Sequence, residues 1–214
     1  MSHNLTTNHD GLPRCAWCAS APEFPAYHDT EWGFPVDDDI RLFEKISLEA
    51  FQSGLSWRTI LVKRPAFRAA FCDFDFHRIA QFSEDDVAAL LGNPGIVRHR
   101  GKIAAVINNA KRAIDMQEAH GSLAAFFWQY EPAPSTFAEP QSVTTCAESI
   151  ALSKDLKKLG WKFVGPTTMY AFMQAMGLIN DHVHGCMIRE RVAQARTRFS
   201  RPTAFPGGPL HSPS

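Results

Sequence analysis

The chain lacks an excess of charge of either sign. Its 214 residues include 22 Lys and Arg and 22 Asp and Glu, so the formal net charge is zero. Proteins that bind nucleic acids usually carry a basic excess, so the overall charge argues at first against such a ligand. The chain also lacks the composition of a disordered protein, because 45% of its residues are hydrophobic.

Long apolar runs are absent as well. No stretch approaches the roughly 18 uninterrupted apolar residues that a membrane helix needs. The start of the chain has no apolar run after a basic segment, so it does not resemble a secretory signal. Cysteine is scarce and odd in number, with five residues. These features predict a cytoplasmic protein without a membrane partner, in which clustered cysteines bind metal more often than they form disulfides.

The sequence contains no internal repeat and no low-complexity linker, and both ends differ from the rest. Residues 1–13 are polar and aperiodic, which predicts a disordered leader. Residues 199–214 contain four prolines and two glycines, which predicts a disordered tail. Residues 14–198 remain for a single domain, which is long enough to form two helical lobes around a core.

Helical patterns fill this domain, and strand alternation is weak. Asp37, Asp38 and Asp39 are placed where a helix N-terminus favours acidic residues. The apolar residues that follow, up to Phe51, are spaced for one buried helix face. The same criteria predict helices over residues 83–91, 98–118, 123–128, 149–159 and 166–177, with a turn at 92–95. We therefore expect an all-α fold with short loops between packed helices.

Possible metal ligands lie at both ends of the domain. They are Cys15, Cys18, His28, His182, His184 and Cys186. Read separately, they fit buried free cysteines and solvated histidines. Read together, they can supply the four sulfur and nitrogen ligands of a tetrahedral zinc site. His182 and Cys186 are one helical turn apart, and a Cys2His2 site would join the two ends of the domain as a structural clip.

One segment combines aromatic side chains with a carboxylate. Glu49 lies among apolar residues of a predicted helix, either on its polar face or in a pocket. Trp17, Trp32 and Trp57 are equally compatible with core packing and with a slot for a flat heterocycle. In such a slot aromatic faces stack on a base, and a carboxylate accepts from its exocyclic amino group. Periodicity alone leaves both interpretations open.

The charges are segregated along the chain. Residues 23–51 contain eight acidic and two basic residues, a net charge of −6. Residues 96–112 contain five basic residues and no acid, next to a glycine turn that opens a helix. Such a helix start presents free N–H groups and the positive end of the dipole to a phosphate. A solvated helix start is the alternative interpretation of the same segment.

Five motifs stand in a distinctive order: YHDTEWG at 27–33, LEAFQSGLSW at 48–57, GIVRHRGKI at 95–103, KFVG at 162–165 and GLINDH at 177–182. Together they resemble the type I 3-methyladenine DNA glycosylases. The resemblance covers about residues 15–186. It implies an all-α member of the helix-hairpin-helix glycosylase superfamily, with one structural zinc ion. It also implies a monomeric enzyme that flips 3-methyladenine out of double-stranded DNA and hydrolyses its N-glycosidic bond.

The resemblance assigns roles to particular positions. The zinc ligands would be Cys15, His28, His182 and Cys186. Glu49 would be the catalytic residue of the base pocket, where it accepts hydrogen bonds and favours the positive charge of the base. The base would be bound by Tyr27, Trp57, Trp17 and Phe24. DNA contacts would come from Gly54, Leu55, Gly95, Arg98, Arg100, Gly101 and Lys102. Phe24 replaces a tyrosine of some relatives and lacks the hydroxyl, and Cys18 and His184 are additional to the zinc pattern.

Other function classes share parts of these patterns. A zinc-stabilised DNA-binding module without catalysis would not need Glu49, Tyr27 and Trp57 together. A zinc hydrolase for small molecules would need an open coordination position, so only three protein ligands would bind the metal. A plain helical binding protein would keep all its aromatic residues in the core.

Overall fold

The computed structural model describes residues 4–7 and 10–203, and helices make up most of this part. Along the chain the elements are β1 (Leu5–Thr7), β2 (Pro13–Cys15), η1 (Ala16–Ser20), α1 (Phe24–Thr30), α2 (Asp39–Gln52), α3 (Trp57–Ala70), η2 (Cys72–Phe74), α4 (Phe76–Ile79), α5 (Glu84–Gly92), α6 (Arg100–His120), α7 (Leu123–Phe127), η3 (Trp128–Tyr130), η4 (Pro134–Thr136), α8 (Ala147–Lys158), α9 (Pro166–Ala175) and α10 (Arg189–Arg198). The expected all-α class is confirmed for the described residues, which add one small hairpin to the helices.

Local capping explains where several helices begin. The Asp38 carboxylate accepts from the Arg41 N–H at the start of α2, at 2.8 Å. Ser83 and Asp86 form a reciprocal capping box at the start of α5. Each predicted helix is present, with its ends shifted by a few residues. The sequence patterns did not predict α1, α3 or α10.

The N-terminal leader differs from its prediction as a disordered segment. Leu5–Thr7 pairs antiparallel with Pro13–Cys15, and residues 1–3 and 8–9 lie outside the described part. The hairpin is ordered because tertiary contacts hold its second strand. The Arg14 guanidinium donates to the carboxylates of Asp10 and Asp29 at 2.7 to 3.0 Å. A polar segment of this kind carries no periodic pattern that would have predicted its order.

The predicted tail also begins later than residue 199. The Phe199 ring packs on Trp128 with ring centroids 4.4 Å apart, and the Arg201 guanidinium donates to the Trp128 carbonyl. This corrects the predicted boundary, because these two contacts with Trp128 hold the chain past the end of α10. The disorder predicted for residues 204–214 concerns a segment outside the described residues.

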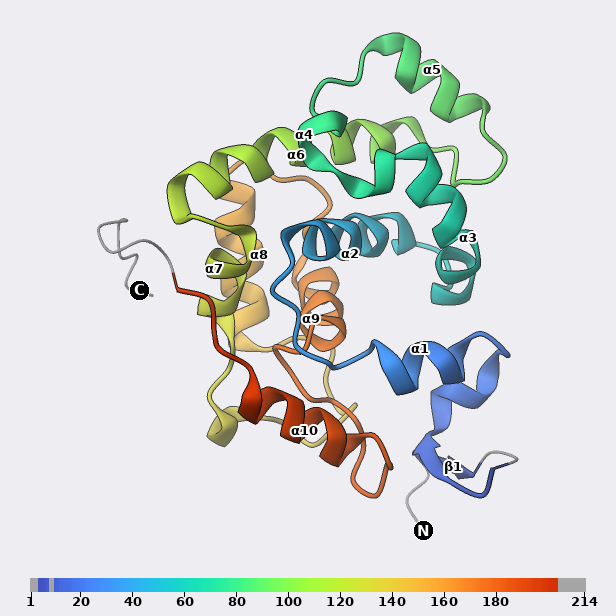
Figure 1. Cartoon of the computed structure of the whole chain (residues 1–214), viewed down its shortest axis with the longest axis vertical. Coiled ribbons are helices and arrows are strands. Elements are labelled where there is room, and N and C mark those ends of the chain that lie inside the picture. The colour runs from blue at the N-terminus through green and yellow to red at the C-terminus, as the bar shows by residue number, and fades with distance from the viewer. Residues whose placement is uncertain (1–3, 8–9, 204–214) are drawn as a thin grey trace.

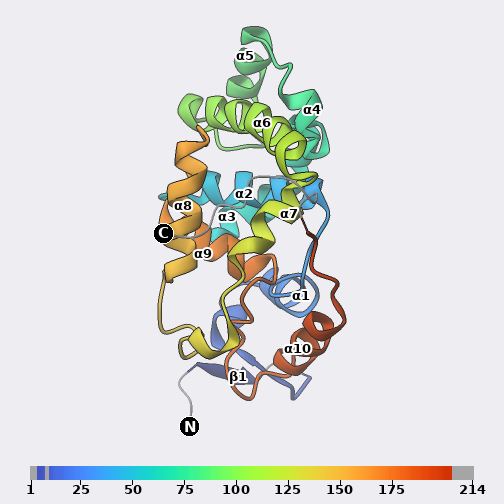
Figure 2. The ribbon, with the colours of Figure 1, turned by 90° about the vertical axis from the view of Figure 1, so that its left-hand side faces the viewer.

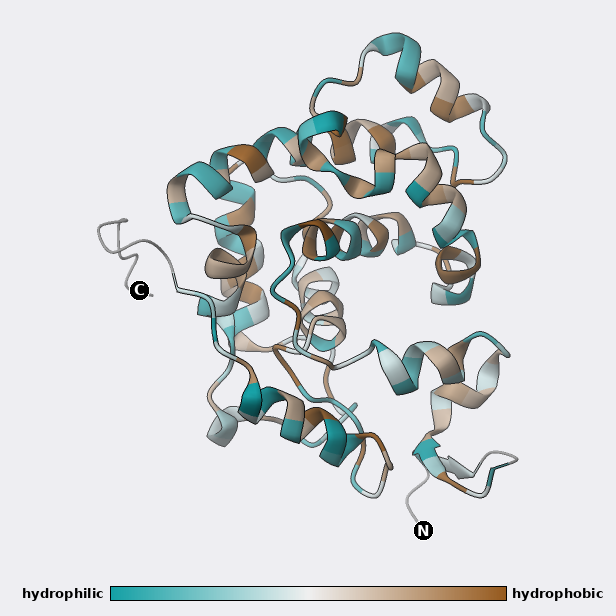
Figure 3. Cartoon of the chain, in the orientation of Figure 1, coloured by the Kyte–Doolittle hydropathy of each residue, from teal (hydrophilic) through white to brown (hydrophobic). Residues whose placement is uncertain are grey.

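The helices are arranged around α2 and α9, which pack against each other at the centre (Figures 1 and 2). The helices α4, α5 and α6 gather at one end of the molecule, and the hairpin, α1 and α10 gather at the other. Hydrophilic and hydrophobic residues both occur along most helices (Figure 3). The buried face of α2 includes Leu42, Phe43 and Ile46, each at most 1% exposed. Across the described residues, every helix is too short or too polar to cross a bilayer.

Candidate base pocket and metal centre

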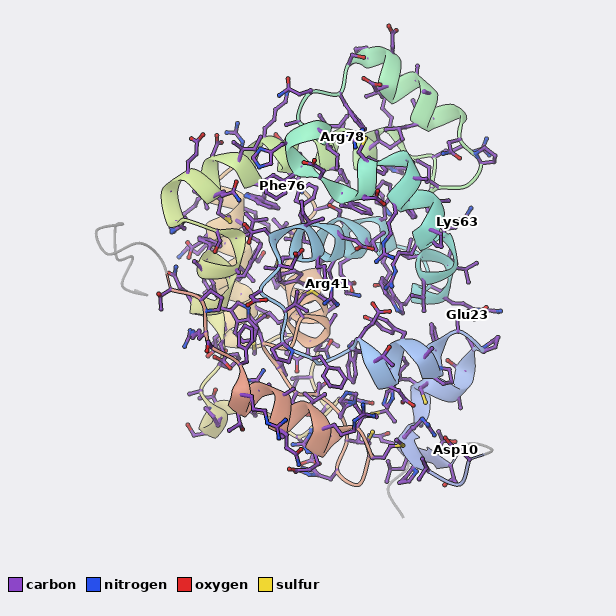
Figure 4. The ribbon with its side chains drawn as sticks, in the orientation of Figure 1. Asp10, Glu23, Arg41, Lys63, Phe76 and Arg78 are labelled. Carbon is purple, nitrogen blue, oxygen red and sulfur yellow. The ribbon has the colours of Figure 1, made fainter. Side chains whose placement is uncertain are left out.

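A cavity of about 540 Å³ lies between the η1–α1 segment on one side and α2, α3 and α9 on the other. Its lining combines aromatic rings with a few polar groups: Trp17, Ser20, Ala21, Phe24, Tyr27, Trp32, Glu49, Gln52, Ser56, Trp57, Arg58, Ala171 and Gln174. In Figure 4, Glu23 marks the α1 side of this region and Lys63 the α3 side. The five residues predicted to form a base pocket therefore line one cavity, and Trp32 joins them.

A tight connection between α2 and α3 places Trp57 in the cavity wall. Gly54 has a φ of +81°, a conformation that glycine adopts without strain. The Ser56 hydroxyl then accepts from the Thr59 N–H and caps α3, so Trp57 is the first residue of that helix. The ring centroids of Tyr27 and Trp57 are 5.4 Å apart. The two rings come from different elements, so they meet only in the folded chain.

The opposite wall is a cluster of aromatic rings. Trp17 packs edge-on against Phe24 at 5.6 Å and against Trp32 at 5.1 Å between ring centroids. The two walls are also joined by an ion pair between Arg58 at the start of α3 and Glu23 at the start of α1, at 3.1 Å. The result is a slot with apolar faces, which suits a flat heterocycle.

Glu49 lines the slot and belongs to a buried pair of opposite charges. Glu49 is 6% exposed, and its Oε1 lies 2.9 Å from the Nζ of Lys45, one helical turn earlier in α2. The same ammonium donates to the Tyr27 hydroxyl at 2.7 Å and lies 3.5 Å from the ring centre of Trp57. Lys45 therefore contacts three of the five residues that were predicted to form the base pocket.

The surroundings favour the charged ammonium and the neutral phenol. Burial works to lower the pKa of Lys45, but the attraction of Glu49 and the Tyr27 oxygen outweighs it and raises that pKa. Burial raises the pKa of Tyr27, although Lys45 acts in the opposite direction. At neutral pH Lys45 is thus a cation beside Glu49, and the Tyr27 hydroxyl is uncharged.

A second cluster joins the two ends of the domain. The ligand atoms of Cys15, His28, His182 and Cys186 all lie within 4.8 Å of one another, and all four residues are buried. The distance from the Cys186 sulfur is 3.5 Å to His28 Nε2 and 4.0 Å to His182 Nδ1. In a tetrahedral zinc site such sulfur–nitrogen distances are about 3.6 Å, given the usual bond lengths. The donor set and its spacing therefore fit zinc.

Outer hydrogen bonds orient both histidines toward this centre. His28 Nδ1 contacts the Asp29 carboxylate at 2.7 Å, which directs Nε2 inward. His182 Nε2 contacts the Trp32 carbonyl at 3.0 Å, which directs Nδ1 inward. Carboxylate and carbonyl partners of this kind are typical of metal-binding histidines. The Arg14 guanidinium in turn holds Asp29.

The two additional candidate ligands, Cys18 and His184, lie apart from the metal centre. Cys18 packs with Ala21 and Phe24 in a separate buried group. His184 is exposed and its Nε2 lies 3.7 Å from a Glu139 oxygen. The structure therefore brings together the four ligands that the resemblance assigned and leaves out Cys18 and His184.

The basic turn lies between α5 and α6. Arg98, Arg100 and Gly101 are exposed, and the Gly95 carbonyl accepts from the Lys63 ammonium. Gly54 and Leu55 are exposed at the α2–α3 connection, with Leu55 at 41%. The α5–α6 turn and the α2–α3 connection therefore expose backbone groups and side chains that an external ligand can contact.

Lys102 has a different position from the one predicted for a DNA contact. It is buried, and its Nζ donates to the carbonyls of Phe51 and Ser53 at 2.8 and 2.6 Å. The lysine thus caps the C-terminal end of α2, where a cation is favourable. A phosphate contact by the Lys102 ammonium would break both hydrogen bonds, so this position does not favour the predicted role. The charge pattern along the sequence did not distinguish Lys102 from its exposed neighbours.

Residues 17–190 match the family model described as methyladenine glycosylase. The chain belongs to this family. A relative from Escherichia coli named DNA-3-methyladenine glycosylase 1 is 46% identical over 179 residues, which cover 82% of this chain and 96% of the relative. A relative from Haemophilus influenzae named DNA-3-methyladenine glycosylase is 44% identical over 177 residues, covering 81% of this chain and 96% of the relative.

Solved structures of the methyladenine glycosylase family have the same fold. A crystal structure of 3-methyladenine DNA glycosylase I has a TM-score of 0.76 and 47% identity, covering 81% of this chain and 98% of that chain. A structure of 3-methyladenine DNA glycosylase I from Staphylococcus aureus, which describes the structural basis of 3-methyladenine recognition, has a TM-score of 0.75. It is 35% identical to this chain, and the match covers 82% of this chain and 96% of that chain. Most of α10 lies beyond the span that matches the family model.

The sequence patterns did not indicate Lys45 or two polar residues that line the cavity, Gln52 and Gln174. Lys45, the buried partner of Glu49, precedes it by four positions, so the spacing of the pair was a signal in the sequence. Gln52 continues the same helix and also had a spacing signal. Gln174 comes from α9, and nothing local in the sequence indicates that α9 reaches the cavity.

Proposed function

We propose that this protein is a DNA repair enzyme that excises 3-methyladenine from alkylated DNA and leaves an abasic site. Membership of the methyladenine glycosylase family and the named activity of its relatives support this function. The observation that carries it in this chain is the meeting of Trp57, Tyr27 and Glu49 around one aromatic cavity. A DNA-binding module without catalysis would have no use for that arrangement.

The cavity suggests how a flipped base is held. Trp57 stacks on the base, and Glu49 accepts a hydrogen bond from its exocyclic amino group. Tyr27 completes the polar contacts, and Trp17 and Phe24 form the apolar wall. Methylation at N3 makes the adenine cationic and weakens its bond to the sugar. Capture of the base in a fitted slot then supplies much of the rate, without protonation of the leaving group.

The chemical step is a hydrolysis. As the bond between C1′ and N9 breaks, its electron pair passes to the base, which becomes neutral, and the positive charge moves to the sugar. Water then adds to C1′ and releases a proton. Among the described residues that line the cavity, Glu49 is the one carboxylate. Because Glu49 lines the slot together with the aromatic residues that would hold the base, its position favours a role in recognition.

DNA contacts belong to two exposed segments in this proposal. The helices α5 and α6 and the turn between them form the helix-hairpin-helix, in which Gly95, Arg98, Arg100 and Gly101 contact the phosphates of double-stranded DNA. Gly54 and Leu55 enter the space left by the flipped nucleotide. We assign the chain one domain with two helical lobes, to which the hairpin and the segment after α10 also belong, and which acts as a monomer in the cytoplasm.

Zinc would be held by Cys15, His28, His182 and Cys186. Because four protein ligands complete its coordination, the ion would stabilise the fold and would not activate water. It would join the hairpin and α1 to the segment before α10. This arrangement argues against a zinc hydrolase, which needs an open coordination position.

The test is release of free methylated purine from alkylated duplex DNA, with Glu49→Gln as the variant. We expect release by the wild-type protein and a large loss in Glu49→Gln, because the variant removes the negative charge, replaces one acceptor oxygen with an NH2 donor and leaves the Lys45 charge unpaired. Binding of the duplex without any base release by the wild-type protein would instead support the DNA-binding module. Full activity of Glu49→Gln would remove Glu49 from the mechanism.

A further inference from the structure

Lys45 contacts three residues that line the cavity, and the proposed function leaves it without a role. It is a buried ammonium whose Nζ contacts Glu49 at 2.9 Å, Tyr27 at 2.7 Å and the Trp57 ring centre at 3.5 Å. Burying a lysine costs free energy unless close partners compensate, so such a position calls for an explanation. A cation is also an unexpected neighbour for a site that captures a cationic base.

We propose that Lys45 is a positioning and specificity-determining residue that cancels the charge of Glu49 and makes the base pocket electrically neutral. The inference rests on the proposed excision of 3-methyladenine. It changes the expectation that Glu49 favours the positive charge of the base. Glu49 keeps its role as a hydrogen-bond acceptor, and the ion pair fixes the orientation of its carboxylate.

The position of the ammonium also limits how a base can stack. With Nζ 3.5 Å from the ring centre, Lys45 covers one face of Trp57. A base that stacks on this ring would therefore use the opposite face, and the Glu49 oxygen that is not paired with Lys45 is the one left to accept from its amino group. The side chain of Lys45 thus fixes the orientation of three base-contacting residues through a single charged group.

Neutrality of the pocket has a consequence for the reaction. The base is cationic while it is attached to the sugar, and it becomes neutral as it takes the electron pair of the breaking bond. An isolated buried carboxylate would hold the cationic form more tightly than the neutral form, which would oppose cleavage. Lys45 removes this bias, because its field on the base is opposite in sign to that of Glu49.

Two small molecules test separately how the pocket binds the cationic and the neutral form of the base. The fixed cation 3,9-dimethyladeninium resembles the base in DNA, and free 3-methyladenine, at a pH where it is neutral, resembles the product. Calorimetric titration of each gives the ratio of cation affinity to neutral-base affinity. We expect Lys45→Met to raise this ratio by about tenfold, because it exposes the charge of Glu49. Glu49→Gln should lower the ratio by about the same factor, since it exposes the charge of Lys45.

Two further variants separate charge from packing. Lys45→Arg keeps the positive charge, so its ratio should stay within about twofold of the wild-type ratio. The double variant Lys45→Met with Glu49→Gln removes both charges, so its ratio should return toward the wild-type ratio. If Lys45→Met fails to fold, Glu49→Gln and the double variant still test the inference, because the first leaves one positive charge and the second leaves neither charge.

An unchanged ratio in Lys45→Met, or an equal loss of affinity for both probes, would overturn the inference and leave Lys45 a packing residue. An unchanged ratio in Glu49→Gln would overturn it as well. If the wild-type protein releases base while the ratios do not move, this inference alone fails. If the wild-type protein binds neither probe and releases no base, the proposed function fails and the inference fails with it.

Discussion

Glu49 illustrates how the surroundings of a side chain define its chemistry. The same carboxylate on a solvated helix face would be an ordinary surface acid. Here it is 6% exposed, paired with Lys45 and placed in the wall of an aromatic cavity. Because an unpaired buried charge is strongly unfavourable, Lys45 and the Tyr27 hydroxyl are part of what permits a carboxylate at this depth.

Trp57 provides a direct test of stacking. We expect Trp57→Ala to slow base release by about 10- to 100-fold, because stacking of a base on an aromatic ring is worth roughly 1–3 kcal/mol. Trp57→Phe keeps an aromatic face and should retain more of the activity. The measurement is single-turnover release of 3-methyladenine from duplex DNA. Equal rates for Trp57→Ala and the wild-type protein would exclude a stacking role.

The helices differ in how they serve the proposed function. The ends of α2 and α3 meet at the cavity, and Lys102 of α6 donates to the Phe51 and Ser53 carbonyls at the end of α2. This contact ties the α5–α6 turn to the connection that carries Leu55. A phosphate bound at the start of α6 would therefore lie on an element that directly supports the nucleotide-facing loop.

Two exposed arginines test the DNA interface at the start of α6. Arg98→Ala and Arg100→Ala should each weaken duplex binding and reduce the slope of log affinity against log salt by about 1, because each loses one phosphate contact. Lys157→Ala, an exposed residue of α8, makes the same change in charge and serves as the control. Titrations of a duplex at several salt concentrations measure the slopes. Equal slopes in all three variants would place the phosphates elsewhere.

Distant segments of the chain are joined at the metal centre. Cys15 ends β2 and His28 lies in α1, whereas His182 and Cys186 lie just before α10. Without an ion, four buried ligands would face one another with few other partners. Metal binding would therefore contribute directly to the free energy of folding.

Metal analysis and thermal unfolding test this centre. We expect one zinc ion per chain and a fall in melting temperature of at least about 10 °C after chelation, because structural zinc sites contribute large folding free energies. Cys186→Ser should lose the ion. Cys72→Ser, which changes a cysteine outside the cluster, should keep it. Full zinc content in Cys186→Ser would show that the ligand set is different.

The net charge of zero is the sum of acidic and basic segments that lie in different parts of the chain. Opposite charges are concentrated in different parts of the chain, with a net of −6 over residues 23–51 and a basic segment over 96–112. Several of the acids are paired in the fold, as Glu31 is with Arg64 at 2.8 Å. Few basic groups remain exposed at the α5–α6 turn, so the phosphate contacts should be few.

Helix starts were predictable because their signals are local. Asp38 and Ser83 cap helices whose apolar residues repeat at helical spacing, and these signals act within a few residues. The helix α3 escaped prediction because it contains Pro65 and several charged residues. The helix α10 escaped because it buries only Val192 among its ten residues.

The motifs also indicated the family, the four metal ligands and the five residues around the cavity, since these are residue types in a fixed order. The folded chain alone distinguished Lys102 from Arg98 and Arg100, because burial against the end of α2 depends on how α6 packs. It also placed Lys45 against Trp57 and Tyr27, which come from other elements. Local order along a chain records capping and periodicity, whereas the partner of a buried charge is chosen by contacts between segments far apart in sequence.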